Sequence, residues 1–304
     1  MLIPIITGPT GVGKSKLSEY LSEIYSIEIV SADAFQVYRF MDIGTSKPPR
    51  DVLNKVRHHL INILNPDELY SAGRFVEECE KILESIIIRG KLPLIVGGTA
   101  MYIERLVSGI FGDMGTESSE IRKSLEKQAD MEGYYALYER LKKIDNNYAL
   151  KIHPNDKVRI IRALEVYEKY KKPYSRLLSA KHKKPKFNYK IFLLRKERDI
   201  MYEMANRRVD LMFEKGWIKE VENLLNIGYN KSLHSFRAIG YLDIANYLEG
   251  VISLEEVKNI IKRKTRQFIK RQLTYFKHMK NLDAVSDRGA IEEYFKNNYR
   301  QYRL

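Results

Sequence analysis

The sequence predicts an α/β fold with a central parallel sheet, an all-helical insertion domain and a helical C-terminal region. Short apolar runs alternate with amphipathic stretches in the N-terminal third, which is the strand–helix–strand order typical of a parallel sheet. A glycine-rich loop follows the first apolar run directly. Between about residues 113 and 173 the apolar residues recur only at helical spacing, and glycine and proline are sparse.

The individual elements follow from the spacing of the apolar residues. The first run, LIPIIT, is apolar almost throughout, as expected of a buried strand, and Leu17, Leu21 and Ile24 then lie on one helical face. The same spacing returns between Phe75 and Ile86. We expect strands at 2–7, 27–33, 92–99 and 189–195, and helices at 16–25 and 75–87.

The change in periodicity sets the expected domain boundaries. We expect a core domain over 1–112 and 181–304, which includes basic C-terminal helices, and a helical insertion domain over 113–180. The motif HPND at 153–156 marks a break between helices inside the insertion.

The composition is that of an ordinary globular protein, with 304 residues of which 44% are hydrophobic and 30% charged. The single cysteine, Cys79, excludes an internal disulfide and a multi-cysteine zinc site. Apolar runs fall short of the ~18 residues that a membrane helix needs, and the N-terminal run is too short for a signal peptide. We therefore expect a soluble, cytoplasmic protein with no membrane partner, and nothing in the sequence demands more than a monomer.

The net charge of +14 is concentrated in the C-terminal part of the chain. Residues 181–304 carry 27 Lys and Arg against 15 Asp and Glu, a net charge of +12, whereas residues 1–110 carry 12 against 13. Such a localised excess favours a polyanionic partner, of which nucleic acid is the commonest. A lysine-rich composition without any partner is the alternative interpretation.

The glycine-rich loop GPTGVGKS fits the phosphate-loop pattern Gly-x4-Gly-Lys-Ser/Thr in its usual context, between a strand and a helix. Its glycines let backbone N–H groups approach phosphate oxygens, and the N-terminus of the helix adds its dipole. Lys14 supplies positive charge, and the hydroxyl of Ser15 can reach Mg²⁺. The predicted phosphate-binding residues are Gly8, Pro9, Thr10, Gly11, Val12, Gly13, Lys14 and Ser15.

An acidic residue is missing where kinases and ATPases commonly carry one. The strand LPLIV ends in Gly97-Gly98-Thr99, without a carboxylate that could help to hold Mg²⁺. The strand-end acid nearest the loop in sequence order is Asp33. Because the carboxyl ends of parallel strands line the ligand crevice, we expect Asp33 to face the phosphate loop, where it could ligate Mg²⁺ indirectly or act as a general base. A capping or turn aspartate is the structural alternative.

The segment KNIIKRKTRQFIKRQLTYFKHMK, Lys258–Lys280, holds nine Lys or Arg and no acid. As a helix with aromatic neighbours it suits a phosphate backbone. A solvated basic face and a membrane-surface helix are the alternatives. We expect an inner stripe of Ile261, Thr265, Phe268, Gln272 and Phe276, with Lys258, Lys262, Arg266, Lys270 and Lys277 pointing outward.

Seven segments together resemble a known family, the tRNA dimethylallyltransferases (isopentenyltransferases), in the same order along the chain. These segments are GPTGVGKS, SADAFQVYRFMDIGTSKP, IVGGTAMYI, IHPNDKVRIIRALEVY, RRVDLMFEKGWIKEV, FRAIGY and TRQFIKRQLTYF. The resemblance implies a P-loop NTPase-like core that transfers a dimethylallyl group from dimethylallyl diphosphate to the exocyclic amine of adenine 37 in tRNA. It implies that Asp33 is the general base, that Thr10 holds the bridging oxygen of the diphosphate and that Arg208 binds the diphosphate. Ser15 would bind Mg²⁺ through that diphosphate.

The resemblance also implies a set of contacts to the tRNA anticodon stem-loop, from which the target adenine must be flipped out. The implied tRNA-binding residues are Asp33, Ala34, Phe35, Gln36, Met101, Arg122, Arg159, Arg162, Ser235, Arg237, Arg266, Gln267, Lys270, Arg271 and Gln272. The chain departs from the family at Met204, where relatives often carry arginine, so a second cation near the diphosphate is missing or replaced.

Three other functions compete with tRNA modification. An adenylate isopentenyltransferase would run the same chemistry on free AMP or ADP, but it has no need for the basic segment or the insertion. A P-loop small-molecule kinase or ATPase is disfavoured by the acid-free strand end at Gly97. A non-catalytic RNA-binding module leaves the phosphate loop unexplained.

Overall fold

The computed structural model of the protein describes residues 2–109, 119–179, 184–279, 282 and 287–304. These form two compact units, the first made of Met1–Val107 with Lys186–Leu304 and the second of Ser108–Pro185. The domain limits expected from the sequence, 112/113 and 180/181, fall outside the described residues, as does Lys280 at the end of the predicted basic helix.

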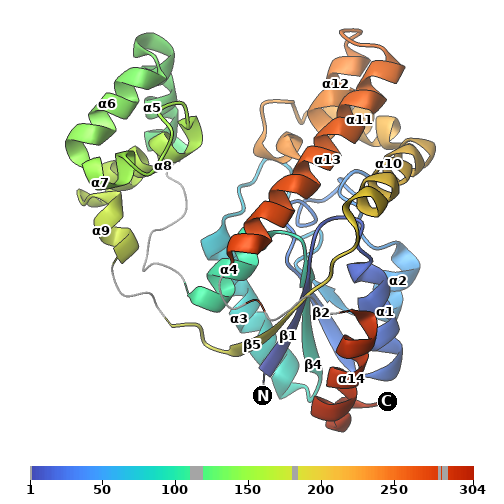
Figure 1. Cartoon of the computed structure of the whole chain (residues 1–304). Helices are drawn as coiled ribbons and strands as arrows, with labels where there is room; N and C mark the ends of the chain where they lie inside the picture. The colour runs from blue at the N-terminus through green and yellow to red at the C-terminus, as the bar shows by residue number, and fades with distance from the viewer. Residues whose placement is uncertain (1, 110–118, 180–183, 280–281, 283–286) are drawn as a thin grey trace. The chain divides into compact units, whose positions relative to one another are not determined.

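A five-stranded parallel sheet forms the centre of the first unit, with strand order β3-β2-β4-β1-β5 (Figure 1). The strand β1 lies between β4 and β5, and Ile5 is in register with Ile95 on one side and Ile191 on the other. The strands are β1 Leu2–Thr7, β2 Ile27–Ser31, β3 His58–His59, β4 Leu92–Gly97 and β5 Asn188–Leu193. The four predicted strands are confirmed, and the α/β fold with them.

The two-residue strand β3 was not predicted, because it is too short to show any periodicity. The Nε2 atom of its second residue, His59, lies 2.8 Å from a carboxylate oxygen of Glu28. Glu28 is only 1% exposed. Arg89 and Lys91 approach the same carboxylate. His59 therefore has a structural role at the edge of the sheet.

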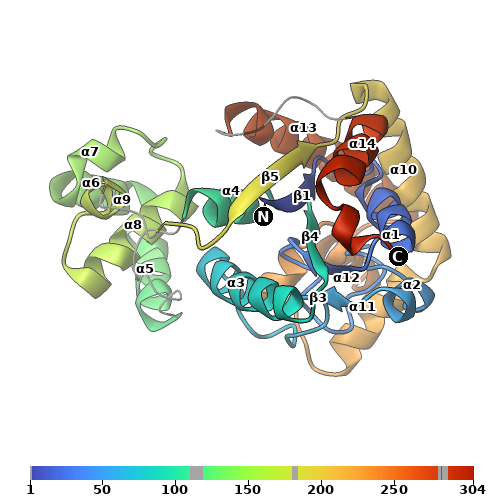
Figure 2. The ribbon, with the colours of Figure 1, turned by 90° about the horizontal axis from the view of Figure 1, so that it is seen from below.

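Helices cover both faces of the sheet (Figure 2). One face packs against α1 and α14 in a core that includes Leu21, Phe192 and Phe295, while α3 lies on the other side and buries Phe75 and Leu83. The helices described in this unit are α1 Lys14–Ile24, α2 Arg50–Lys55, α3 Ala72–Ile88, α4 Ala100–Ser108, α10 Arg198–Glu214, α11 Trp217–Asn226, α12 Tyr241–Leu248, α13 Leu254–His278 and α14 Arg288–Asn298, with 3-10 turns η1 His234–Arg237 and η2 Arg300–Tyr302.

The basic helix α13 begins at a capping box, in which Ser253 and Glu256 satisfy each other's backbone N–H groups. The predicted outward face of α13 is partly wrong. Lys262 pairs with Asp210 at 2.6 Å, and Lys258 and Arg266 also contact side chains of α10, namely Phe213 and Asn206. These three cations face α10 because that helix packs along this side of α13, where Ile269 is buried, while Ile261, Gln272 and Phe276 of the expected inner stripe are buried as well. Gln267, Lys270, Arg271 and Lys277 remain exposed.

The second unit is a small helical bundle with its own core. Leu137, Leu141, Ile160 and Leu164 lie at its centre and are fully buried. The predicted break at HPND is confirmed, because Asp156 caps the helix that follows by accepting the N–H of Arg159. The helices are α5 Ser119–Glu132, α6 Tyr134–Ile144, α7 Asn146–Ala149, α8 Lys157–Tyr170 and α9 Tyr174–Ser179.

Candidate active site

A cavity of about 580 Å³ opens at the carboxyl ends of the strands in the first unit. Its lining includes Thr10 and Lys14 after β1, Asp33 after β2, Gly98 after β4 and Arg208 of α10. The topology explains this convergence, because the ends of parallel strands meet at one edge of the sheet. The structure thus brings together in one cavity the groups that the sequence analysis had singled out separately.

The phosphate loop turns through Gly8, Gly11 and Gly13, all with positive φ, and α1 begins at Lys14. The side chain of Lys14 folds back over the loop, and its Nζ donates to the carbonyl oxygens of Gly8 and Pro9 at 2.8 Å each. Burial lowers the pKa of Lys14 to about 7; Arg208 lowers it further and Asp33 opposes the shift. The loop is therefore arranged around a half-buried cation that lines the cavity.

Arg208 lies opposite the loop and is held by two hydroxyl groups. Its Nε donates to Ser46 Oγ at 2.8 Å, and its Nη1 donates to Thr10 Oγ1 at 3.0 Å. Burial lowers the pKa of Arg208, while the negative charge of Asp33 opposes that change. With both bonds made, the planar guanidinium has a fixed orientation above the phosphate loop, which suits recognition of phosphate oxygens.

Asp33 is held by the turn that follows β2. Its Oδ1 accepts the backbone N–H groups of Phe35 at 2.9 Å and Gln36 at 3.3 Å, so the structural interpretation as a turn aspartate holds for this oxygen. Within the described part of the chain no hydrogen bond is made to Oδ2. One carboxylate oxygen is thus fixed to the backbone, and the other is available to a ligand in the cavity.

The end of β4 lets the chain carry Asp33 into this position. A side-chain carbon at Gly97 would lie 2.1 Å from the carbonyl oxygen of Ala32, so glycine is required where the chain leaves β2. Thr99 completes the contact, because its Oγ1 accepts the N–H of Ala34 at 3.1 Å. β4 thus ends in glycine rather than in an acidic residue, and Gly97 leaves the space in which the chain passes from Ala32 to Asp33.

Gln272 of α13 connects the basic helix to the phosphate loop. Its Oε1 accepts the backbone N–H of Thr10 at 3.0 Å, and its Nε2 donates to the carbonyl oxygen of Gly98 at 2.9 Å. The side chain is 6% exposed. Gln272 thus fixes the loop against the end of β4, and its expected contact with RNA stays a prediction.

Comparison with known proteins identifies the family of this site. The sequence model of the IPP transferase family matches residues 36–279, most of the chain. The chain belongs to the IPP transferase family.

Individual relatives and solved structures agree with that membership. A tRNA dimethylallyltransferase of Caldanaerobacter subterraneus is 45% identical over 278 residues, covering 90% of this chain and 88% of that protein. One of Acetivibrio thermocellus is 42% identical over 301 residues, covering 98% and 96%. The crystal structure of a tRNA isopentenylpyrophosphate transferase from Bacillus halodurans superposes with a TM-score of 0.69 at 36% identity and covers 99% of this chain and 96% of its own. A eukaryotic dimethylallyltransferase acting on tRNA gives a TM-score of 0.80 at 27% identity, covering 98% of this chain and 77% of its own.

The RNA-contact residues expected of an IPP transferase are distributed unevenly in the structure. The side chain of Ser235 is fully buried, and its hydroxyl has no hydrogen-bond partner among the described residues. Arg122, Arg159 and Arg162 lie in the second unit, each close to an acid on its own helix or at that helix's cap. The expected residues that line the cavity are Asp33, Ala34, Phe35, Gln36, Met101, Arg237, Arg271 and Gln272.

Several residues of this IPP transferase site were missed by sequence reasoning. Ser46 holds Arg208 and Thr99 holds the segment around Asp33, yet each lies inside a quoted motif and was given no role. Thr265 and Phe268, expected in the inner stripe of α13, instead line the cavity. Their position inside the family motifs was the available signal.

The buried bridge made by Gln272 can be tested by a Gln272→Leu substitution, which leaves the N–H of Thr10 and the carbonyl of Gly98 without partners. Unpaired buried groups cost about 1–3 kcal/mol each, so we expect affinity for inorganic diphosphate to fall about 10- to 100-fold in isothermal titration calorimetry. Thr274→Ala, an exposed change on the same helix, is the matched control. Equal diphosphate affinity in the two variants would show that Gln272 does not position the loop.

Proposed function

We propose that this IPP transferase transfers a dimethylallyl group from dimethylallyl diphosphate to the exocyclic amine of adenine 37 in tRNA and releases diphosphate. The observation that carries the proposal is a single cavity in which Lys14 and Arg208 face the carboxylate of Asp33, while the neighbouring strand β4 ends in glycine. Phosphate-binding groups that face a general base suit a substitution reaction. In such a reaction a nitrogen nucleophile attacks a carbon, and a diphosphate leaves from that carbon. The relatives named above are called tRNA dimethylallyltransferases, which supports a dimethylallyl transfer to tRNA.

The phosphate loop and Arg208 bind the leaving group in this proposal. The bond between the allylic carbon and the diphosphate oxygen breaks, and its electron pair goes to that oxygen. Cationic groups fixed around the departing oxygens stabilise the charge that develops on them. We assign to the hydroxyl of Thr10, whose Oγ1 accepts from Arg208 in this structure, a hydrogen bond donated to the bridging oxygen.

Asp33 serves the acceptor side of the reaction. An aromatic exocyclic amine is a weak nucleophile, so its proton must leave as the new bond from nitrogen to carbon forms. Oδ2 of Asp33 takes that proton, while Oδ1 keeps the carboxylate in place through the N–H groups of Phe35 and Gln36. The bulky, partly exposed ring of Phe35 lies beside Asp33 for contact with the target base.

The residues present fit a magnesium ion bound through the diphosphate. Ser15 lines the cavity next to Lys14, and no side chain in the described ranges bonds to its hydroxyl. Ser15 would hold the ion together with the diphosphate oxygens, as oxygen ligands suit Mg²⁺. When bound, the ion neutralises part of the negative charge on the leaving group.

The anticodon stem-loop is the proposed binding partner of the exposed cations. The cations Lys270 and Arg271 and the neutral Gln267 are exposed on α13, and Arg271 also lines the cavity, so this face leads from solvent to Asp33. Phosphate contacts of this kind position an RNA without reading its sequence. We assign Arg122, Arg159 and Arg162 of the second unit to the same partner.

Among the described residues, none of the helices combines the length and the apolar character needed to cross a membrane.

The unusual acidity of Lys14 predicts how donor binding depends on pH. In the free protein its pKa is about 7, and a bound diphosphate must raise that pKa because it favours the cation. Above pH 7 binding therefore takes up a proton, and the dissociation constant should rise about fivefold between pH 7 and pH 8. Calorimetry with dimethylallyl diphosphate, without tRNA, in buffers of different ionisation enthalpy measures both quantities. A constant affinity with no proton uptake would contradict the assignment of Lys14.

An acceptor competition tests the function against its rivals. Unmodified tRNA and AMP are supplied together with radiolabelled dimethylallyl diphosphate, and we expect the label in tRNA. Preferential labelling of AMP would identify an adenylate isopentenyltransferase, and ATP hydrolysis without tRNA and without label transfer would identify a kinase or ATPase. We propose that the protein acts as a monomer.

A further inference from the structure

The loop that joins β2 to α2 is strained beside the cavity. Four residues other than glycine have positive φ here or in the facing segment after β3: Phe40 at 66°, Ser46 at 54°, Leu60 at 61° and Asn62 at 56°. Such conformations cost about 1–3 kcal/mol each and persist only where surrounding contacts determine them. We call residues 38–47 the Arg208-support loop, because Ser46 within it accepts from Arg208.

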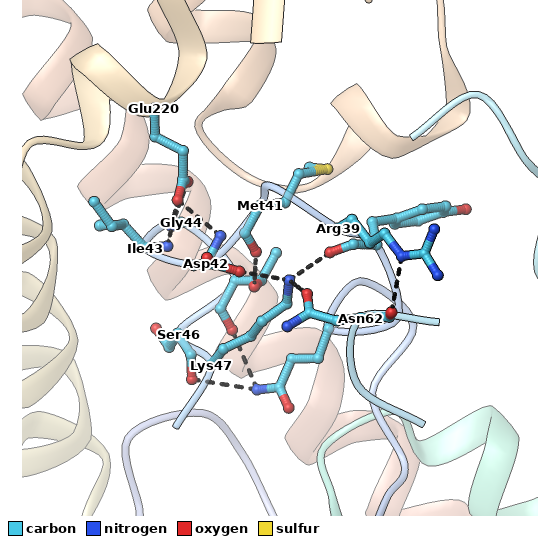
Figure 3. Close-up of polar contacts among 12 residues, drawn as sticks. Arg39, Met41, Asp42, Ile43, Gly44, Ser46, Lys47, Asn62 and Glu220 are labelled. Atoms are coloured by element: carbon cyan, nitrogen blue, oxygen red, sulfur yellow. Dashed lines mark hydrogen bonds and ion pairs between the residues drawn. The ribbon is translucent and has the colours of Figure 1, made fainter. Parts of the chain in front are cut away.

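Glu220 of α11 holds one side of this loop (Figure 3). Its Oε2 accepts the backbone N–H groups of Asp42 at 2.7 Å and Ile43 at 2.6 Å, and its Oε1 accepts that of Gly44 at 3.1 Å. The hydroxyl of Tyr241 donates to Oε1 at 2.7 Å. Three successive N–H groups that point at one carboxylate form an anion-binding concavity, so the loop conformation depends on a negative charge from α11.

Lys47 holds the other side of the same loop (Figure 3). Its Nζ donates to Asp42 Oδ1 at 2.7 Å and also to the side-chain oxygen of Asn62 and the carbonyl of Tyr38. The side chain is 2% exposed, and burial lowers the pKa of Lys47 while Asp42 opposes the shift. Lys47 therefore joins the start of the loop, its middle and the facing segment at one point.

The loop held in this way supports two groups of the site. Ser46 accepts the Nε of Arg208 at 2.8 Å. The carbonyl oxygens of Thr45 and Ser46 accept the side-chain amide of Gln36 at 3.3 Å each, and Gln36 Oε1 accepts from Ser31. A movement of the loop would thus displace both the arginine above the phosphate loop and the glutamine that lines the acceptor side.

We propose that Glu220 and Lys47 are positioning residues of the transferase, which hold the Arg208-support loop in its strained conformation so that Ser46 orients Arg208 on the diphosphate. This inference rests on the proposed function for the meaning of the diphosphate, but its binding test requires no turnover. Neither residue lines the cavity, so both act through Ser46 rather than by contact with substrate.

Glu220→Gln tests the inference most directly. In this variant an NH2 group takes the place of one of the two carboxylate oxygens, so a donor faces backbone N–H groups that have lost their acceptor. Glu222→Gln, two residues along α11, removes an exposed carboxylate that pairs with Lys219 and serves as the control. We expect the dissociation constant for inorganic diphosphate, measured by calorimetry, to rise about tenfold in Glu220→Gln and to stay within twofold in Glu222→Gln. The Michaelis constant for tRNA should also rise in Glu220→Gln, because the same loop supports Gln36, and it should stay within twofold in Glu222→Gln.

A purely structural role of Glu220 would lower the amount of folded protein, which calorimetry reports as a lower stoichiometry with unchanged affinity. Unchanged affinity would therefore overturn the inference even for a poorly folding variant. Ser46→Ala completes a double-mutant cycle with Glu220→Gln. The double variant should bind diphosphate about as weakly as the weaker-binding single variant. If the two fold-losses in affinity multiplied instead, Glu220 would not act through Ser46. If the wild-type chain formed no isopentenyl-adenosine, the proposed function would be refuted. The effect of Glu220→Gln on diphosphate affinity would still test the positioning role, because that measurement needs no turnover.

Discussion

Replacement of Asp33 by asparagine is expected to reduce the rate of dimethylallyl transfer by about 10²- to 10⁴-fold, the usual contribution of a positioned general base. Asparagine keeps an oxygen that can accept the N–H groups of Phe35 and Gln36, so the turn after β2 is preserved. What is lost is the basic oxygen Oδ2. The rate is measured as single-turnover formation of isopentenyl-adenosine with enzyme in excess over tRNA.

The matched control for Asp33→Asn is Asp51→Asn, an exposed change on α2 that should leave the rate unchanged. Binding of tRNA, followed by gel shift, should be retained in both variants because the exposed cations of α13 are untouched. If Asp33→Asn weakened tRNA binding but kept a normal rate for each bound tRNA, the assignment of Asp33 as the base would be wrong.

Replacement of Arg208 by lysine is expected to lower the transfer rate by about 10²- to 10³-fold, comparable to the loss of one donor that stabilises a developing oxyanion. Lysine keeps the charge but cannot bond Ser46 and Thr10 at once in the planar arrangement of the guanidinium. The rate constant at saturating donor and tRNA is the quantity to measure, since it reports charge stabilised in the transition state.

Arg207 offers a close control for Arg208. It is the preceding residue on α10, is 77% exposed in its side chain and pairs with Glu203. Arg207→Lys should therefore keep the wild-type rate. Equal rates for the two variants would show that the planar guanidinium of Arg208 contributes nothing beyond its positive charge.

The fold was largely predictable because its signals are local. The strands β1 and β4 are short, largely apolar runs such as LIPIIT, and the phosphate loop is contiguous in sequence, so a single stretch of residues carries the information. Asp33 was found because parallel strand ends converge, which is a rule of topology rather than of detailed packing. The fold prediction is confirmed by the sheet order and by the related structures.

The supporting contacts of the site were not predictable, because they join residues that are distant in the chain. Arg208 and Thr10 are 198 positions apart, and Gln272 and Thr10 are 262 apart. Periodicity places Gln272 on the inner side of α13, but it does not reveal that the neighbour there is a phosphate loop. For the same reason Lys262 was expected in solvent, whereas α10 presents Asp210 to it.

The central claim is that the diphosphate held between Lys14 and Arg208 is a leaving group lost to an adenine of tRNA. Its most direct test is incubation of the purified protein with dimethylallyl diphosphate, Mg²⁺ and unmodified tRNA, followed by nuclease digestion and nucleoside mass spectrometry. The account predicts isopentenyl-adenosine at position 37, formed by the wild-type chain and not by Asp33→Asn over the same interval. Unmodified adenosine throughout, with the donor intact and the tRNA bound, would contradict it.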